Sequence, residues 1–382
     1  MVEPQRRWSD EVARHLLAPL LRTPVSRSGW RLVSWDAEQG ICVSLAKGDT
    51  VLLVELEDRD DARPCFDHTR LFNATVRRQF QATVPITDED RAVTDALLAM
   101  VRRREADLEL PERSVSSRRT HVRTIEVDRV LMPEGQGHYY LNPYVGCMIG
   151  CSFCYVMDRA DLSRRLEGLP AVPWGSWVDV KVNAPDVLRE ELRRLPPGLV
   201  RMSPIVTDPY MPLERKYRVT RQCLELLLPA GFRPVLLTRA ARVVDDLDLL
   251  RAWPNVAVGL SIPTDDDRWR ALFEPGGDPI EERFEALEAL AAAGVSTFAV
   301  VQPMLPMDPE RLAARIGPLA RAVRVDRMHD LWRVRHLYEQ GGIPWAAEDA
   351  FFVETEAALR ASFARQGVPV DDLDDLAPLV AG

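Results

Sequence analysis

The sequence predicts an α/β protein with an open, partial (β/α)6 TIM-like barrel, an N-terminal α+β domain and a C-terminal helical extension. From His138 onward, short apolar segments alternate six times with amphipathic helical segments. Several of the apolar segments lack polar alternation, which is typical of parallel strands buried on both faces. The residues before Gly137 follow a different pattern, and they predict a separate unit.

Residues 1–105 form the predicted N-terminal domain, whose role the sequence does not assign. Residues 8–21 and 88–104 have the apolar spacing of amphipathic helices. Between them, alternating residues predict three strands, at 29–34, 41–45 and 51–55. The domain carries no catalytic motif that we recognise; Cys65 and His68 are either a weak metal pair or part of a packed loop.

Residues 106–128 are charged and contain the segment ELPERSVSSRRTHVRT, which predicts a linker. Its basic residues form a local cluster: Arg118, Arg119, His121 and Arg123. We interpret this cluster as a solvated face, and contact with phosphate groups is the alternative.

Residues 129–326 form the predicted barrel. Its strands are expected at 137–141, 200–206, 234–238, 256–262, 297–301 and 322–326. The clearest helices between them are expected at 185–195, 221–228, 279–293 and 309–320. Asp278 and Asp308 each precede a proline, which predicts that both cap a helix N-terminus. Residues 327–382 form the C-terminal extension, with a helix near 352–365.

Composition limits the class of protein. The chain has 382 residues and a net charge of −9, which does not favour a general nucleic-acid binder. No run of 18 apolar residues occurs, so we expect no membrane span, and the charged N-terminus does not resemble a secretory signal. We therefore expect a cytoplasmic protein.

The central motif is NPYVGCMIGCSFCY, in which Cys147, Cys151 and Cys154 have the spacing C-x3-C-x2-C. Three thiolates on a short loop suit a soft metal or an iron–sulfur cluster. On a cubane cluster they would leave one iron without a protein ligand. Structural zinc takes four ligands, so a zinc site would need His138 as well. A zinc module and unliganded core thiols both remain alternatives. The loop follows the first predicted barrel strand, at the end where barrel enzymes carry their sites.

The motif resembles the signature of the radical S-adenosylmethionine (radical SAM) superfamily. The segments VKVNAP and VTDPYMPLE are similar to those of the spore photoproduct lyase-like branch, and the resemblance covers about residues 130 to 310. It implies a 4Fe-4S cluster on the three cysteines, with SAM on the fourth iron, and cleavage of SAM to methionine and a 5′-deoxyadenosyl radical. It also implies an electron donor, such as a reductase, flavodoxin or ferredoxin.

The resemblance implies SAM contacts on the loop and at two strand ends. The backbone of Phe153 is expected to touch adenine, and Tyr155 to pack near the cluster. Thr207 and Asp208 occupy the place where the family binds the SAM amino group. Arg239 lies in Thr-Arg-Ala, where related sequences often have Thr-Lys-Ser, so the charge is kept and the hydroxyl is lost.

Further contacts are expected on later segments. Ser261 is expected to reach ribose or substrate, Arg283 to hold the SAM carboxylate, and Gln302 to contact adenine. The alternative interpretation of Arg283 is an ion pair on the helix surface with neighbouring acidic residues. The sequence assigns no catalytic residue, although His329 and His336 are candidate acids or bases.

The sequence does not identify the substrate. The hypotheses are a small molecule or peptide, a nucleic-acid lesion as in spore photoproduct lyase, and a non-enzymatic zinc module. The stretch from Ser203 to Val206, where that lyase has its hydrogen-donating cysteine, contains no thiol, so we expect no repair of spore photoproduct. Cys223, on a predicted helix, is interpreted as a core thiol.

Overall fold

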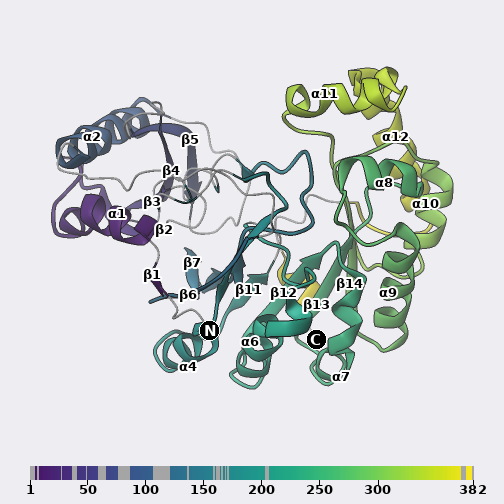
Figure 1. The fold of residues 1–382 in the computed structure, drawn as a ribbon, viewed down its shortest axis with the longest axis horizontal. Coiled ribbons are helices and arrows are strands. Elements are labelled where there is room, and N and C mark those ends of the chain that lie inside the picture. Colours follow the sequence, from purple (N-terminus) through teal and green to yellow (C-terminus); the bar gives the residue numbers. More distant parts are fainter. Residues whose placement is uncertain are drawn as a thin grey trace.

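The computed structural model describes residues 5–6, 8–26, 28–36, 41–48, 50–58, 66–75, 87–105, 121–135, 137–157, 160, 164, 167, 169, 172–202, 206–370 and 376–380. Its elements form a central parallel sheet with helices around it, a smaller sheet beside it and an N-terminal unit (Figure 1). Within the described part of the chain, no helix has both the length and the apolar character of a membrane span.

The central sheet has seven strands in the order β15-β14-β13-β12-β11-β8-β7. Every neighbouring pair is parallel except β7 and β8, which are antiparallel. The strands are β7 (Met132–Gly135), β8 (His138–Tyr140), β11 (Leu199–Met202), β12 (Arg233–Thr238), β13 (Ala257–Ser261), β14 (Ser296–Val301) and β15 (Val323–Val325). All six strands expected for the barrel form, so the α/β class is confirmed.

Helices occupy the connections between these strands, and they include the four clearest ones that the sequence predicts. The helical elements are α4 (Ala184–Leu192), α5 (Glu214–Tyr217), α6 (Val219–Leu227), η2 (Ala241–Asp246), α7 (Leu247–Leu250), α8 (Asp267–Phe273), α9 (Ile280–Ala292) and α10 (Pro309–Ile316).

Only one of the two predicted N-caps forms. Asp308 caps α10, because its carboxylate accepts hydrogen bonds from the backbone N–H groups of Glu310 and Arg311. The prediction for Asp278 was wrong: α9 begins one residue later, and the Asp278 carboxylate accepts from the Ala241 N–H at 2.7 Å instead.

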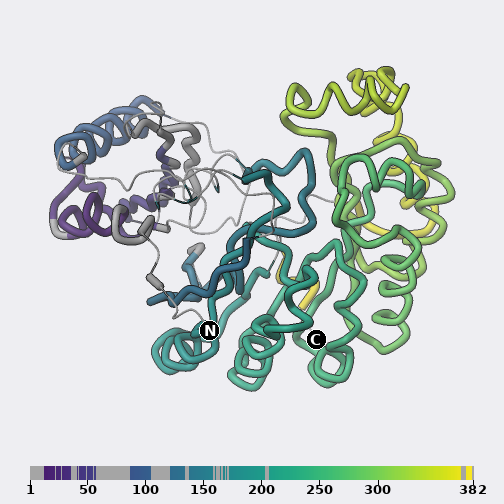
Figure 2. Tube along the Cα trace, viewed as in Figure 1, coloured from purple at the N-terminus to yellow at the C-terminus, as the bar shows by residue number. Residues whose placement is uncertain are grey.

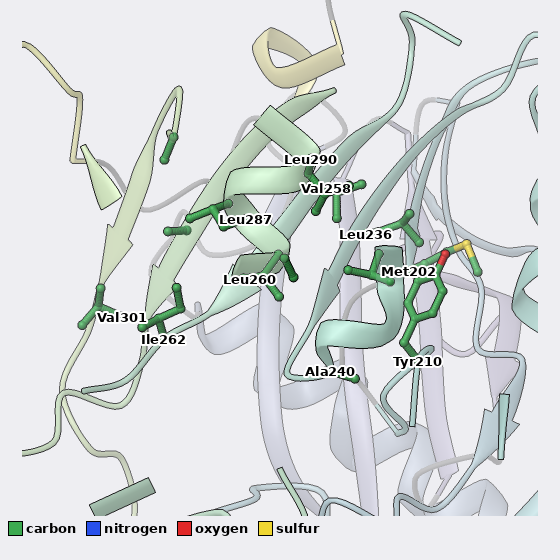
Figure 3. Packing of buried hydrophobic residues seen from close by; sticks show 14 of the residues in the cluster. Met202, Tyr210, Leu236, Ala240, Val258, Leu260, Ile262, Leu287, Leu290 and Val301 are labelled. Carbon is green, nitrogen blue, oxygen red and sulfur yellow. The ribbon is translucent and has the colours of Figure 1, made fainter. Parts of the chain in front are cut away.

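The main hydrophobic core lies between the central sheet and its helices. All residues of β13 and β14 are buried, as expected for inner parallel strands. Leu287 and Leu290 of α9 lie beside Val258 and Leu260 of β13 (Figure 3). Burial of each such leucine stabilises the fold by roughly 1.5–3 kcal/mol. This packing fixes where each strand ends, and therefore where the polar residues after it lie.

A second sheet of four strands lies in the order β1-β6-β10-β9. Its strands are β1 (Gln5–Arg6), β6 (His121–Glu126), β9 (Tyr144–Val145) and β10 (Trp177–Lys181). Part of the predicted linker is therefore a strand. Arg123 does not belong to a solvated face either, because its guanidinium pairs with Asp179 at 2.6 Å and with Glu167. Arg118 and Arg119 lie outside the described residues.

The N-terminal unit contains the helical elements α1 (Trp8–Leu17), η1 (Ala18–Arg22) and α2 (Asp88–Glu105) and an antiparallel sheet. The sheet has four strands, one more than expected: β2 (Arg31–Asp36), β3 (Ile41–Lys47), β4 (Thr50–Asp58) and β5 (Phe66–Thr75). Leu16, Leu45, Val54 and Leu97 belong to a core cluster that is distinct from the main one. Cys65 and the side chains of Cys42 and His68 lie outside the described part.

The C-terminal extension is helical, as expected. It comprises α11 (Leu331–Gln340), η3 (Pro344–Ala347), α12 (Asp349–Arg365) and η4 (Ala377–Val380). The yellow end of the trace lies against the central sheet (Figure 2). There Leu379 and Val380 pack on residues of the sheet, and the Ser296 hydroxyl donates to the Leu379 carbonyl at 2.6 Å.

Candidate active site

The cysteine loop is held in place by backbone hydrogen bonds to two distant segments. The Gly146 N–H donates to the Val206 carbonyl at 3.0 Å, after β11. The Ser152 N–H donates to the Phe273 carbonyl, and the Gly276 N–H donates to the Ile149 carbonyl, each at 2.9 Å. The loop therefore lies beside the segments that follow β11 and α8.

Close backbone contacts leave the loop no space for side chains at its glycines. Gly150 has a φ of +63° and faces Gly175, where a Cβ would lie 2.9 Å from the Gly150 Cα. A Cβ at Gly276 would lie 2.3 Å from the Met148 carbonyl oxygen. Glycine is needed at these positions because the two backbones touch.

The three motif cysteines gather within this loop as free thiols. Cys147 and Cys151 are buried and Cys154 is half-buried. Burial raises the pKa of Cys147 to about 12 and the pKa of Cys151 well above its ordinary value, and the neighbouring thiols raise the pKa of Cys151 further. Buried thiols ionise readily only when a cation compensates them, which fits iron as their partner.

The zinc alternative gains no support from this geometry. Among the residues that the structure describes, no three His, Cys, Asp or Glu side chains converge on a point where one metal ion could bind. Thiolates that hold separate corners of a cubane do not need to converge on one point.

Asp208 is completely buried beside the loop, and its carboxylate is already hydrogen-bonded. One oxygen accepts from the Thr238 hydroxyl at 2.5 Å and from the Tyr210 N–H at 2.9 Å. The other accepts from the Arg239 N–H at 2.7 Å. Burial raises the pKa of Asp208. Thr207, also buried, precedes it. These bonds tie the segment after β11 to the end of β12.

A buried ion network joins two of the expected arginines through Glu274. The Arg239 Nε lies 2.7 Å from Glu274 Oε1, and the Arg283 Nη2 lies 2.6 Å from Glu274 Oε2. The side chains of Glu274 and Arg283 are fully buried, and 14% of the Arg239 side chain is exposed. Burial opposes ionisation of Glu274, but the charges of Arg283 and Arg239 hold its pKa below the usual value. The surface ion pair considered for Arg283 is therefore not what forms.

Ser261, at the end of β13, has a buried hydroxyl without a hydrogen-bond partner in the part of the chain that the structure describes. Its carbonyl accepts from the Arg283 Nη1 at 2.8 Å. A buried polar atom without a partner needs an explanation, and a ligand at this edge would supply one. The donor set and this free hydroxyl together fit a cluster with SAM beside it.

Gln302 links the network to a further cluster of charges. Its carbonyl accepts from Arg239 Nη2 at 3.4 Å, and its side chain donates to Asp326 at 3.0 Å. Asp326 also contacts His329 Nε2 at 3.0 Å. His329 thus lies at the carboxyl end of β15, whereas His336 is exposed on α11.

The aromatic residues of the motif lie at the loop's end. The guanidinium of Arg239 lies 5.7 Å from the Phe153 ring centroid, and Tyr155 is 42% exposed. Cys223 is a buried core thiol on α6, as expected. Glu274 and Thr238 could not be found from the sequence, because their partners lie far away in the chain.

The family comparison agrees with this site. Residues 141–316 match the model of the radical SAM superfamily. These residues belong to the radical SAM superfamily. The predicted resemblance to this superfamily is confirmed over these residues. The cofactor chemistry that the superfamily implies is an iron–sulfur cluster with SAM.

Similar proteins match the chain over less than half its length. An uncharacterized protein of Methanocaldococcus jannaschii is 30% identical over 182 residues, which cover 47% of this chain and 66% of that protein. A radical SAM Nalpha-GlyT isomerase of Pseudomonas phage M6 is 30% identical over 167 residues, which cover 43% of this chain and 33% of that protein. The chain thus spans under two thirds of these relatives.

Among solved structures, spore photoproduct lyase complexed with dinucleoside spore photoproduct aligns with a TM-score of 0.47 and 15% identity. The alignment covers 65% of this chain and 81% of that one.

Proposed function

We propose that this chain is an enzyme that holds a 4Fe-4S cluster on Cys147, Cys151 and Cys154 and binds SAM at the carboxyl edge of the central sheet. When bound, the reduced cluster and SAM supply a 5′-deoxyadenosyl radical that abstracts hydrogen from an organic substrate. The gathering of the three motif thiols in one clamped loop supports this most directly. A partial (β/α)6 barrel is the architecture we propose for the six parallel strands.

Different residues hold the cluster and surround SAM. The three cysteines bind iron, and the clamped loop keeps Cys147 and Cys151 away from water. Ser261 offers its free hydroxyl to SAM. Gln302, Phe153 and Tyr155 are the other residues that we propose to contact SAM or the cluster. Thr207 stays among the proposed SAM residues, since it adjoins Asp208 beside the loop.

Asp208 and Arg283 serve SAM binding through their neighbours in this proposal. Their side chains are fully buried, and contacts within the chain occupy them. Asp208 fixes the end of β12, and Arg283 fixes Glu274. Direct contact with the SAM amino or carboxylate group would require them to exchange these partners.

The cluster assignment is tested by anaerobic reconstitution with iron and sulfide. We expect about four irons per chain, absorbance near 400 nm and release of 5′-deoxyadenosine from SAM under reduction. Cys151→Ala should lose the cluster and the release of 5′-deoxyadenosine. Cys223→Ala, which removes a buried thiol on α6, should keep the cluster and the release. Wild-type release of 5′-deoxyadenosine by Cys151→Ala would rule the assignment out.

We propose a small molecule or a peptide as the substrate, and a reductase, flavodoxin or ferredoxin as electron donor. The net charge of −9 gives no general attraction to a phosphate backbone. One relative is named an isomerase. An internal rearrangement of the substrate radical is therefore one outcome that product analysis should include.

The nucleic-acid lesion lyase is the second candidate, and an assay separates it from the first. Reduced protein and SAM would be incubated with a spore photoproduct dinucleotide. We expect no restored thymidylyl-thymidine, because no thiol stands between Ser203 and Val206. Restoration would make a lesion the preferred substrate.

A further inference from the structure

We infer that Arg239 and Glu274 set the reduction potential of the cluster by acting on it with opposite charge, and that Arg283 holds Glu274 in place. This inference rests on the proposed function, because it concerns the cluster on the three cysteines. It assigns these residues an electrostatic role that does not depend on SAM or on the substrate.

Arg239 is fixed beside the cysteine loop by contacts on several sides. Its Nε pairs with Glu274 at 2.7 Å, and its backbone N–H donates to Asp208 at 2.7 Å. Its guanidinium lies over the ring of Phe153, which immediately precedes Cys154. A cation held in this way cannot swing into water.

The charges of this network lie beside the residues that flank the thiols. Glu274 lies between Phe273 and Gly276, whose backbone groups form hydrogen bonds with Ser152 and Ile149 on either side of Cys151. Asp208 accepts from the Arg239 N–H, and it follows Val206 closely, whose carbonyl accepts from the Gly146 N–H next to Cys147. The sulfurs that would bind iron therefore lie within the field of these three side chains, where burial weakens screening by solvent.

The sign of each effect follows from the charge that reduction adds. One-electron reduction makes the cluster more negative, so a nearby cation stabilises the reduced form and a nearby anion destabilises it. Loss of the Arg239 charge should lower the potential, and loss of the Glu274 charge should raise it. General loosening of the site does not predict shifts of opposite sign.

Arg283 has a positioning role. Its Nη2 pairs with Glu274 Oε2 at 2.6 Å, and its Nε and Nη1 donate to the carbonyls of Asp278 and Ser261. Both charges are fully buried, and removing one partner of such a pair is strongly destabilising. The decisive variants should therefore keep the shape of the side chain.

The experiment is an anaerobic redox titration of the reconstituted full chain without SAM or substrate, followed by electron paramagnetic resonance. The variants are Arg239→Gln, Arg239→Lys and Glu274→Gln. The control is Arg268→Gln, an exposed arginine on α8 that pairs with Asp266.

At a fixed potential, Arg239→Gln should shift the ratio of reduced to oxidised cluster about tenfold toward the oxidised form, about 59 mV for one electron. Glu274→Gln should shift it toward the reduced form. Arg239→Lys, which keeps the charge, and Arg268→Gln should stay within about threefold of wild type.

Three results would decide against the inference. The first is that Arg239→Gln and Glu274→Gln shift the ratio of reduced to oxidised cluster in the same direction. The second is that both variants keep this ratio within threefold of wild type. The third is that Arg239→Lys shifts the ratio as much as Arg239→Gln does. If Glu274→Gln takes up no iron, the two Arg239 variants decide. A wild-type chain that takes up no iron contradicts the proposed function, and the inference with it.

Discussion

At the level of single residues, the polar side chains at the carboxyl edge of the central sheet differ in whether they have hydrogen-bond or ion-pair partners within the protein. Asp208, Glu274 and Arg283 are buried and paired, whereas the hydroxyl of Ser261 has no partner. The sequence could predict that Asp208, Ser261 and Arg283 lie together, because each follows a strand or lies in a segment that resembles the family. It could not predict which of them are paired, since Glu274 meets Arg239 and Arg283 only after the chain folds.

Ser261→Ala should weaken SAM binding about 2- to 12-fold, the effect of one neutral hydrogen bond of about 0.5–1.5 kcal/mol. Stability should stay unchanged, because the hydroxyl has no partner among the described residues. Ser296→Ala is the matched control: its hydroxyl donates to Leu379 near the chain's end, so it should lose stability and keep SAM affinity. Anaerobic calorimetry and thermal unfolding measure the two effects, and equal affinities of Ser261→Ala and wild type would exclude the contact.

The pair of His329 and Asp326 should make stability depend on pH. The hydrogen bond that His329 donates to Asp326 raises the pKa of His329, so this stabilisation is present below about pH 6.5 and is lost as pH rises through the raised pKa. Burial opposes ionisation of Asp326, but His329 and Arg324 lower its pKa; that part is lost only on strong acidification.

His329→Gln should therefore reduce the free energy of unfolding more at pH 6 than at pH 9. The effect should be small, because 61% of the His329 side chain is exposed. Urea unfolding at both pH values measures it, with His336→Gln as control. A loss that is equal at the two pH values would show that the pair carries no charge.

For whole elements, the cysteine loop depends on segments that are far from it in the sequence. The strands of the central sheet could be predicted because inner parallel strands are apolar throughout. The short strands β6 and β10 were missed, since their stability comes from pairing with each other and not from a long apolar run. The hydrogen bonds from Ser152 and Gly276 that clamp the loop had no signal in the sequence either.

Gly276→Ala should disrupt this clamp, because the new Cβ would lie 2.3 Å from the Met148 carbonyl oxygen. We expect iron uptake to fall severalfold, measured per chain after reconstitution. Gly294→Ala is the control: its φ of +79° costs about 1–2 kcal/mol, but nothing lies within 4 Å of the new Cβ. Gly294→Ala should lose stability and keep iron. Full iron uptake by Gly276→Ala would show that the clamp is dispensable.

At the scale of the whole molecule, the N-terminal unit has its own core and contains none of the motif cysteines. It still touches the rest of the chain, since β1 pairs with β6 and Arg14 lies 2.8 Å from Asp128. The division into domains was predicted from the charged linker at 106–128 and from the change of pattern from His138 onward. These signals do not reveal such contacts, because each contact joins a short segment of the N-terminal unit to a short segment of the rest of the chain.

A chain that starts near residue 115 should keep the cluster and the uncoupled cleavage of SAM, because the cysteine loop and its clamps lie beyond residue 140. It should lose turnover of the substrate if the N-terminal unit serves recognition. Iron content and 5′-deoxyadenosine release measure the first part. Loss of the cluster in the shortened chain would assign the N-terminal unit a structural role.

The clamp on the cysteine loop also has a consequence for biosynthesis. Cys151 leaves the ribosome about 125 residues before Gly276, the residue that pins its loop. At about 5–20 residues per second, that delay is roughly 6–25 s. During this interval the nascent chain carries three thiols without the enclosure that forms around them later. Under the proposed function, the iron site is therefore complete only after a glycine that is translated long after its ligands.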